Sequence, residues 1–82
     1  MSTSVLVVDD ERDIRLSLAG LLEDEGYVVF DAGNDKDAIA AAAEHDPDII
    51  LLDIWLEGSQ LDGLGILEEV MKRNPDQTAI MM

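Results

Sequence analysis

Three aspartates directly follow two runs of apolar residues that have the composition of buried strands. Residues 5–8, all Val or Leu, lead into Asp9 and Asp10, and residues 49–52, all Ile or Leu, lead into Asp53. If the two runs are neighbouring parallel strands, their carboxyl ends meet at one edge of a sheet, where open α/β sheets bind ligands. Three carboxylates gathered there repel one another unless a cation joins them. The pattern therefore predicts a metal site, and its all-oxygen ligands favour Mg²⁺ over Zn²⁺.

This set of carboxylates suits chemistry on a phosphoryl group. A carboxylate held near a metal can attack phosphorus and carry an acyl phosphate, and the metal offsets the charge of the incoming group. Asp53 is the candidate nucleophile, with Asp9 and Asp10 beside it. Two simpler interpretations remain open: Asp10 could cap a helix that begins near Glu11, and Asp53 could be the first polar residue of a loop.

Composition limits the classes of protein to be considered. The 82 residues suffice for one domain at most, and there is no cysteine for a disulfide or a thiolate metal site. Nineteen acidic and five basic residues give a net charge of −14, which argues against binding to nucleic acid or to anionic membranes and favours cations and basic protein surfaces. The sequence contains neither a run of ~20 apolar residues nor a signal peptide. We expect a cytoplasmic protein.

The elements that must position the aspartates alternate along the chain. Short apolar runs are followed by segments with helical periodicity, which predicts βαβ units and a parallel sheet. The expected strands are residues 4–8, 27–30, 48–53 and 78–82. The expected helices are residues 11–25, residues 34 or 35 to 45, and residues 63–73, with a polar loop over residues 54–62.

Apolar residues at helical spacing mark the packing faces of these helices. The second helix should pack through alanines, which let it approach the sheet closely. The first helix should use Ile14, Leu18, Leu21 and Leu22. The third should carry Leu64, Leu67 and Met71 on one face, with Ile66 and Val70 beside it.

The constellation resembles the receiver domain of two-component response regulators, and the resemblance covers the whole chain in order. The segments that carry it are Val5-Leu6-Val7-Val8-Asp9-Asp10-Glu11, Ile49-Ile50-Leu51-Leu52-Asp53 and Asp62-Gly63-Leu64. The resemblance implies a flavodoxin-like doubly wound parallel sheet, of order 2-1-3-4-5 when intact and here only βαβαβαβ. It also implies that Asp53 is the phosphoacceptor. The implied ligands of Mg²⁺ are Asp9, Asp10, Asp53 and the backbone carbonyl of Trp55.

The same resemblance implies a partner and a mode of action. A sensor histidine kinase would donate the phosphoryl group to Asp53, and the modified domain would control a transcriptional output. Such a domain assists its own phosphorylation and dephosphorylation but turns over no external metabolite, so we do not expect an enzyme.

The loop after Asp53 departs from the usual receiver pattern. Glu57 stands where the family usually has proline, and the distance from Asp53 to Asp62 is about two positions longer than usual. This loop resembles the nitrogen-regulation NtrX branch. In that branch the receiver precedes an AAA+ ATPase that interacts with σ54 and a helix-turn-helix DNA-binding domain.

The last residues, Ala79 to Met82, are apolar, and we expect residues 1–82 to be the N-terminal two-thirds of a single receiver domain without its output domains. The family's hydroxyl residue after the fourth strand and its lysine after the fifth lie outside this sequence. An open sheet edge predicts self-association, as a homodimer or a strand-exchanged oligomer.

Three other functions fit the sequence less well. A phosphohydrolase of the haloacid dehalogenase type would need an acid two residues after the nucleophile, where Trp55 stands. A dinucleotide-binding domain would need a Gly-x-Gly-x-x-Gly motif after the first strand, which is absent. A receiver-like interaction module that signals without phosphorylation would normally lose one of the three acids.

Overall fold

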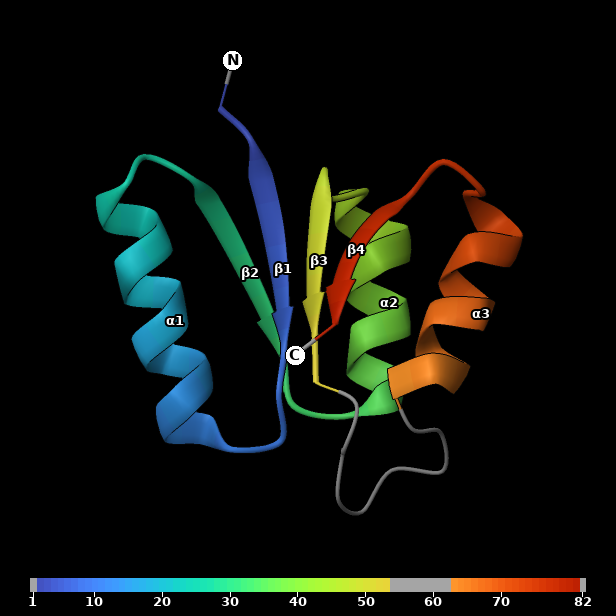
Figure 1. The fold of residues 1–82 in the computed structure, drawn as a ribbon, viewed down its shortest axis with the longest axis horizontal. Helices are drawn as coiled ribbons and strands as arrows, with labels where there is room; N and C mark the ends of the chain where they lie inside the picture. The colour runs from blue at the N-terminus through green and yellow to red at the C-terminus, as the bar shows by residue number, and fades with distance from the viewer. Residues whose placement is uncertain (1, 54–62, 82) are drawn as a thin grey trace.

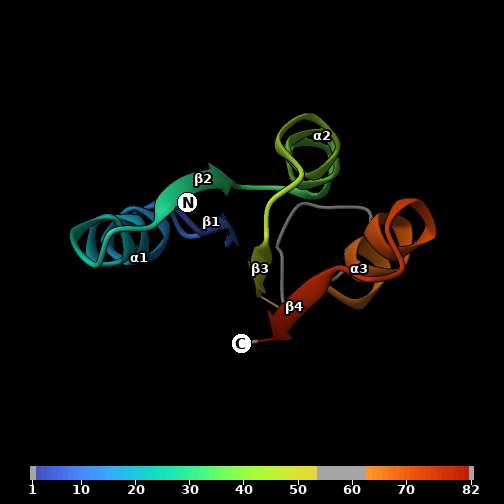
Figure 2. The same cartoon turned by 90° about the horizontal axis from the view of Figure 1, so that it is seen from above.

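The computed structural model describes residues 2–53 and 63–81, which form a four-stranded parallel sheet with helices on both faces (Figures 1 and 2). The strands are β1 (Ser4–Val8), β2 (Val28–Ala32), β3 (Ile49–Leu52) and β4 (Thr78–Met81), and the helices are α1 (Arg12–Asp24), α2 (Asp35–His45) and α3 (Gly63–Arg73). The strand order is β2-β1-β3-β4. The predicted α/β class, the βαβαβαβ alternation and this part of the predicted strand order are confirmed.

The register aligns the carboxyl ends of β1, β2 and β3 at one edge of the sheet. Strand β1 lies between β2 and β3, and Val8 lies opposite Ala32 on one side and Leu52 on the other. All pairings are parallel, so the arrowheads of β1, β2 and β3 point to the same edge of the sheet (Figure 1). The residues that follow β1 and β3 are therefore neighbours, as the sequence predicts.

One face of the sheet packs against α2 and α3 and forms the core. Alternate residues of each strand point to this face, which is the period of two expected of strands. The alanine-rich face of α2 contributes Ala38, as predicted. The buried residues of this core are Leu6, Val8, Ala32, Ala38, Ile50, Leu52, Ile66 and Val70.

On α3, Ile66 and Val70 are buried. The sequence predicts these two beside the main apolar face rather than on it. Ile66 and Val70 are 1% and 5% exposed, whereas Leu67 is half-buried and Met71 is exposed. Residues four apart lie above one another on a helix, so the sheet takes the Ile66–Val70 row. The wide apolar arc of α3 leaves Leu67 and Met71 at the margin of the core.

Helix α1 lies on the opposite face, over β1 and β2 (Figure 2). It covers the buried side chains of Val5 and Val7, yet no residue of α1 itself is buried. Of the predicted stripe, Leu18 and Leu22 are half-buried, while Ile14 and Leu21 are 44% and 64% exposed. Within the described part of the chain no second helix lies beside α1 on this face, so only one side of its apolar stripe is covered.

Strand β2 differs most from its predicted bounds. It begins one residue later than predicted, at Val28, and continues through Asp31 to Ala32. Aspartate is depleted in strands, which is why the sequence suggests an end at Phe30. Asp31 pairs in register with Val7 and forms an ion pair with Arg15 of α1. A tertiary contact therefore overrides the local preference, and it lies beside the candidate site.

Candidate functional site

Backbone hydrogen bonds continue the sheet pairing past the strand ends and fix the first residues of the site. The Asp53 N–H donates to the Val8 carbonyl at 3.0 Å, and the Asp9 N–H donates to the Ala32 carbonyl at 3.1 Å. Asp53 follows β3 and Asp9 follows β1, so each begins from a position set by the neighbouring strand. The backbones of both residues are thus held by pairing with the neighbouring strand.

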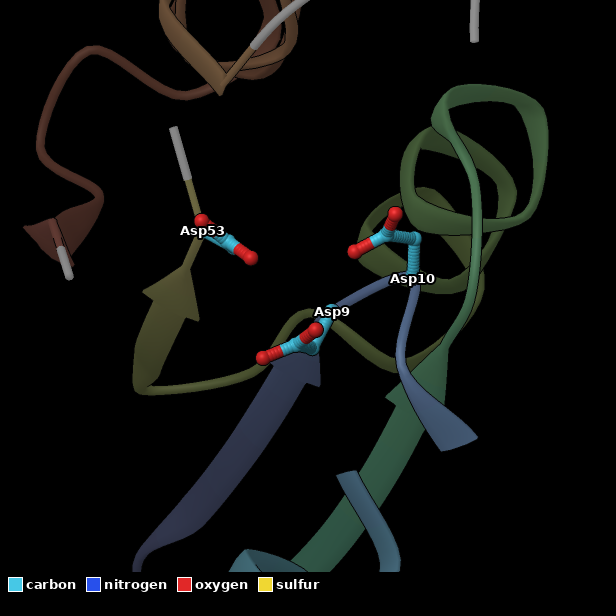
Figure 3. A group of neighbouring side chains, drawn as sticks. All are labelled: Asp9, Asp10 and Asp53. Carbon is cyan, nitrogen blue, oxygen red and sulfur yellow. The ribbon is translucent and has the colours of Figure 1, made fainter. Parts of the chain in front are cut away.

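The three predicted aspartates do come together. One carboxylate oxygen from each of Asp9, Asp10 and Asp53 can be chosen so that all three lie within 4.8 Å of one another. Asp10 and Asp53 reach toward each other from opposite sides, and Asp9 lies between their bases (Figure 3). Asp9 is only 4% exposed, while Asp10 and Asp53 are half-buried. This arrangement confirms the predicted convergence at the carboxyl edge of the sheet.

The start of α1 settles the alternative role of Asp10. The N-cap residue of α1 is Glu11, and its side chain makes no capping hydrogen bond. The interpretation of Asp10 as a helix cap is therefore wrong. It is Asp9 that binds the turn into α1, because its Oδ1 accepts a hydrogen bond from the Glu11 N–H at 2.9 Å.

The surroundings of Asp9 raise the pKa of its carboxyl. Burial raises the pKa of the Asp9 carboxyl above its ordinary value, and the nearby carboxylates of Asp53 and Asp10 raise it further. The hydrogen bond from the Glu11 N–H opposes this rise in pKa. A cation bound between the three carboxylates would offset their mutual repulsion.

The donor set fits a hard divalent cation. Oxygens are the ligands that Mg²⁺ prefers, and one or two carboxylates with additional waters are its usual protein environment. The predicted carbonyl ligand, that of Trp55, and the residue Asp62 lie outside the described residues.

A separate cavity of about 280 Å³ opens between α2 and α3, where Ile39, Val70 and Gln77 are among its lining residues. None of the three aspartates lines it.

Two residues beside the cluster were missed by sequence reasoning. Arg15 of α1 donates from Nη1 to the backbone carbonyl of Asp9 at 2.8 Å, and from Nε to Asp31 Oδ2 at 2.6 Å. No motif marks either residue: Arg15 is one of several charged residues in α1, and Asp31 looks like the start of a loop. Their pairing depends on the packing of α1 against β2.

The fold and the site together define a class of protein. A parallel sheet with its ligand groups at the carboxyl ends of the strands belongs to the open α/β domains, and the acidic edge is suited to a metal and a phosphoryl group. Comparison with protein families agrees with this class, because residues 5–82 match the model of the response regulator receiver domain. The chain belongs to the response regulator receiver family.

Individual relatives narrow the branch of that family. The chain is 44% identical over 82 residues to the nitrogen assimilation regulatory protein NtrX of Azorhizobium caulinodans, covering all of this chain and 18% of that protein. The crystal structure of the receiver domain of NtrX from Brucella abortus matches with a TM-score of 0.89 and 47% identity, over 94% of this chain and 64% of that one. The chemotaxis protein CheY4 of Vibrio cholerae matches with a TM-score of 0.92 at 26% identity, over 99% and 68%.

The relatives named here thus include NtrX proteins from two species, and a response regulator receiver domain is not a conventional enzyme. The chain spans less than a fifth of the length of the Azorhizobium protein. No helix in the described residues is long and apolar enough to span a bilayer.

Proposed function

We propose that this chain is a phosphoacceptor module in which Asp53 takes a phosphoryl group from a sensor histidine kinase, with Mg²⁺ held by Asp9, Asp10 and Asp53. The observation that carries the proposal is the approach of the three carboxylates to within 4.8 Å at the carboxyl edge of the sheet. Membership of the receiver family supports the kinase as the donor. Similarity to NtrX proteins supports a regulatory rather than a metabolic role.

In the proposed transfer, an Asp53 carboxylate oxygen attacks the phosphorus of a phosphohistidine. A P–O bond forms, the P–N bond breaks, and the bonding electron pair returns to the imidazole nitrogen of the kinase, leaving an acyl phosphate on Asp53. The backbone of Asp53 is fixed by its hydrogen bond to Val8, so the attacking carboxylate starts from a defined position. Bound Mg²⁺ would supply positive charge to the phosphoryl oxygens.

The remaining acids have a different task. Asp9 is buried and held in place by the Glu11 N–H, which suits a metal ligand more than a nucleophile that must meet a large donor. Asp10 lies opposite Asp53 in the cluster (Figure 3) and completes the side-chain ligands. By family resemblance we add the Trp55 carbonyl as a further ligand.

The proposed consequence of phosphorylation is a change of state that regulates a transcriptional output. A phosphoryl group at a switch site acts by biasing an element with two arrangements. The NtrX relatives are several times longer than this chain, and we propose that residues 1–82 are the N-terminal two-thirds of one receiver domain in a longer regulator of this kind. In this proposal the output domains, an AAA+ ATPase and a DNA-binding domain, lie elsewhere in that regulator.

Two measurements on the 82-residue chain test this function. The first is a Mg²⁺ titration followed by the fluorescence of Trp55, the single tryptophan. The second is incubation with Mg²⁺ and a small acyl phosphate, followed by intact mass measurement. We expect saturable Mg²⁺ binding and the addition of one phosphoryl group to the wild-type chain.

The matched variants are Asp53→Asn and Asp48→Asn, which change the aspartates that flank β3 on either side. Asp53→Asn should abolish the mass increase and weaken Mg²⁺ binding, while Asp48→Asn should behave as the wild type. Labelling that persists in Asp53→Asn would refute the assignment of the acceptor. A folded wild-type chain that binds no Mg²⁺ would favour an interaction module that signals without phosphorylation.

A further inference from the structure

Arg15 lies at the junction of three elements next to the acidic cluster. It belongs to α1, its Nε contacts Asp31 of β2, and its Nη1 contacts the carbonyl of Asp9 at the end of β1. Its side chain is only 17% exposed. A long charged side chain held this far from water and bound at both sides of its guanidinium has one defined position.

Gly33 leaves the room that this position requires. A Cβ built at Gly33 would lie 2.6 Å from Nη1 of Arg15 and 3.3 Å from its Cζ. The same Nη1 donates to the Asp9 carbonyl. A Cβ at position 33 would therefore require Nη1 to shift, and Nη1 is the atom that makes this hydrogen bond.

The contact fixes the peptide that joins Asp9 to Asp10. The Asp9 N–H is already bound to the Ala32 carbonyl, and Arg15 binds the carbonyl on the other side of the same residue. Because the N–H and the carbonyl of Asp9 are both hydrogen-bonded, the plane of the peptide between Asp9 and Asp10 is fixed. The position of the Asp10 Cα is fixed with it. Asp10 follows directly from this peptide, beyond the end of β1.

We propose that Arg15 is a positioning residue for the metal site, acting through the backbone of Asp9 to hold the Asp9–Asp10 pair in the geometry that binds Mg²⁺. The role assigned to Arg15 rests on the proposed function, because it concerns the same site. Asp31 and Gly33 complete the arrangement: Asp31 orients the guanidinium, and Gly33 makes space for it.

The sign of the expected effect separates this role from simple electrostatics. Removing a positive charge near three carboxylates makes the site more negative, which by charge alone strengthens Mg²⁺ binding. Loss of a contact that positions the ligands weakens Mg²⁺ binding instead. Removal of a residue that supports metal ligands typically weakens metal binding roughly 10- to 100-fold. The two explanations therefore predict changes of opposite direction.

The test is a Mg²⁺ titration of the whole 82-residue chain, at a temperature where circular dichroism shows each variant to be folded. Arg15→Met removes both donors and keeps the length of the side chain. Arg12→Met is the matched control, because Arg12 is exposed, lies one turn earlier in α1 and makes no ion pair with the described residues. Gly33→Ala retains every charge and displaces Nη1.

We expect the dissociation constant of Mg²⁺ to rise by about tenfold or more in Arg15→Met, to rise in Gly33→Ala, and to stay level or fall in Arg12→Met. An Arg15→Met chain that binds Mg²⁺ as tightly as Arg12→Met overturns the positioning role. If Arg15→Met does not fold, Gly33→Ala decides: wild-type affinity in that variant also overturns it. Failure of the folded wild-type chain to bind Mg²⁺ refutes the proposed function itself, and the role of Arg15 with it.

Discussion

Replacement of Asp9 by asparagine should stabilise the metal-free chain while removing its response to Mg²⁺. Asp9 is 4% exposed and shares the cluster with two other carboxylates. Asparagine has nearly the same shape, and its side-chain oxygen can still accept the hydrogen bond that the Glu11 N–H donates at 2.9 Å. The substitution therefore removes a buried charge and retains the local turn.

The expected increase in the free energy of unfolding follows from the distances between the carboxylates. At the upper separation of 4.8 Å, two unit charges repel by about 1 kcal/mol in water and by about 3.5 kcal/mol at an effective dielectric constant of 20. Asp10 and Asp53 are half-buried, so we take the screened end of this range for each of the two pairs that involve Asp9. The expected stabilisation is about 2 kcal/mol, which raises the melting temperature of a domain of this size by about 8 to 16 °C.

The assay is thermal unfolding followed by circular dichroism, first in EDTA and then with increasing Mg²⁺. In EDTA, Asp9→Asn should melt above the wild-type chain. In Mg²⁺ the wild-type chain should gain stability, because the metal binds only the folded state, and the variant should gain little. Asp76→Asn is the control for net charge, since Asp76 is exposed in the turn before β4, and it should match the wild type in both conditions.

Either of two results would contradict this reasoning. A melting temperature in EDTA below that of the wild type would show that repulsion does not dominate at Asp9. Undiminished stabilisation by Mg²⁺ in Asp9→Asn would show that Asp9 is not a ligand. The first result concerns the energetics of the cluster and the second concerns its function, so they can be told apart.

Three further predictions concern pH, the core and a helix cap. The pKa of Asp9 in the folded chain lies above the ordinary value of 3.8, and protons compete with the metal for this carboxylate at a pH near or below that pKa. Titrations at several pH values should therefore show that Mg²⁺ affinity falls as the pH falls through the pKa of Asp9. In EDTA the folded chain binds more protons than the unfolded chain between the two pKa values, so chemical denaturation should show stability falling as the pH rises through that window. Leu52→Ala, at a fully buried position, should cost about 2 to 5 kcal/mol of unfolding free energy by denaturant titration, whereas Leu21→Ala at a position 64% exposed should cost far less. Asn34→Ala removes the side-chain cap that accepts from the Asp37 N–H at 2.8 Å and should cost about 1 kcal/mol in the same assay, and an unchanged midpoint would contradict that role of the cap.

The sequence predicts most of this fold because its local signals agree with one another. Continuous apolar runs such as residues 5–8 are typical of strands covered on both faces, and Val5, Val7 and Val8 are indeed all buried. The exposure of Ile14 and Leu21 could not be predicted in this way. Periodicity reports which side of a helix is apolar, and how much of that side is covered depends on the neighbouring elements.

The candidate site also has one part that the sequence predicts and one part that it does not. The convergence of Asp9, Asp10 and Asp53 follows from the sequence, because parallel strands bring their carboxyl ends to one edge. The pairing of Arg15 with Asp31 does not, since it depends on the position of α1 across β2. A salt bridge between a helix and a strand leaves no periodic pattern, and an aspartate after Phe30 looks like the end of a strand.

The position of Arg15 also explains how a positive charge can lie beside an acidic metal site without competing for it. Its guanidinium contacts the backbone carbonyl of Asp9 and the carboxylate of Asp31, which is not one of the three clustered acids. A cation paired directly with Asp10 or Asp53 would offset the negative charge that attracts Mg²⁺. By pairing Arg15 with Asp31, the fold obtains from a charged side chain a rigid support for the backbone of Asp9.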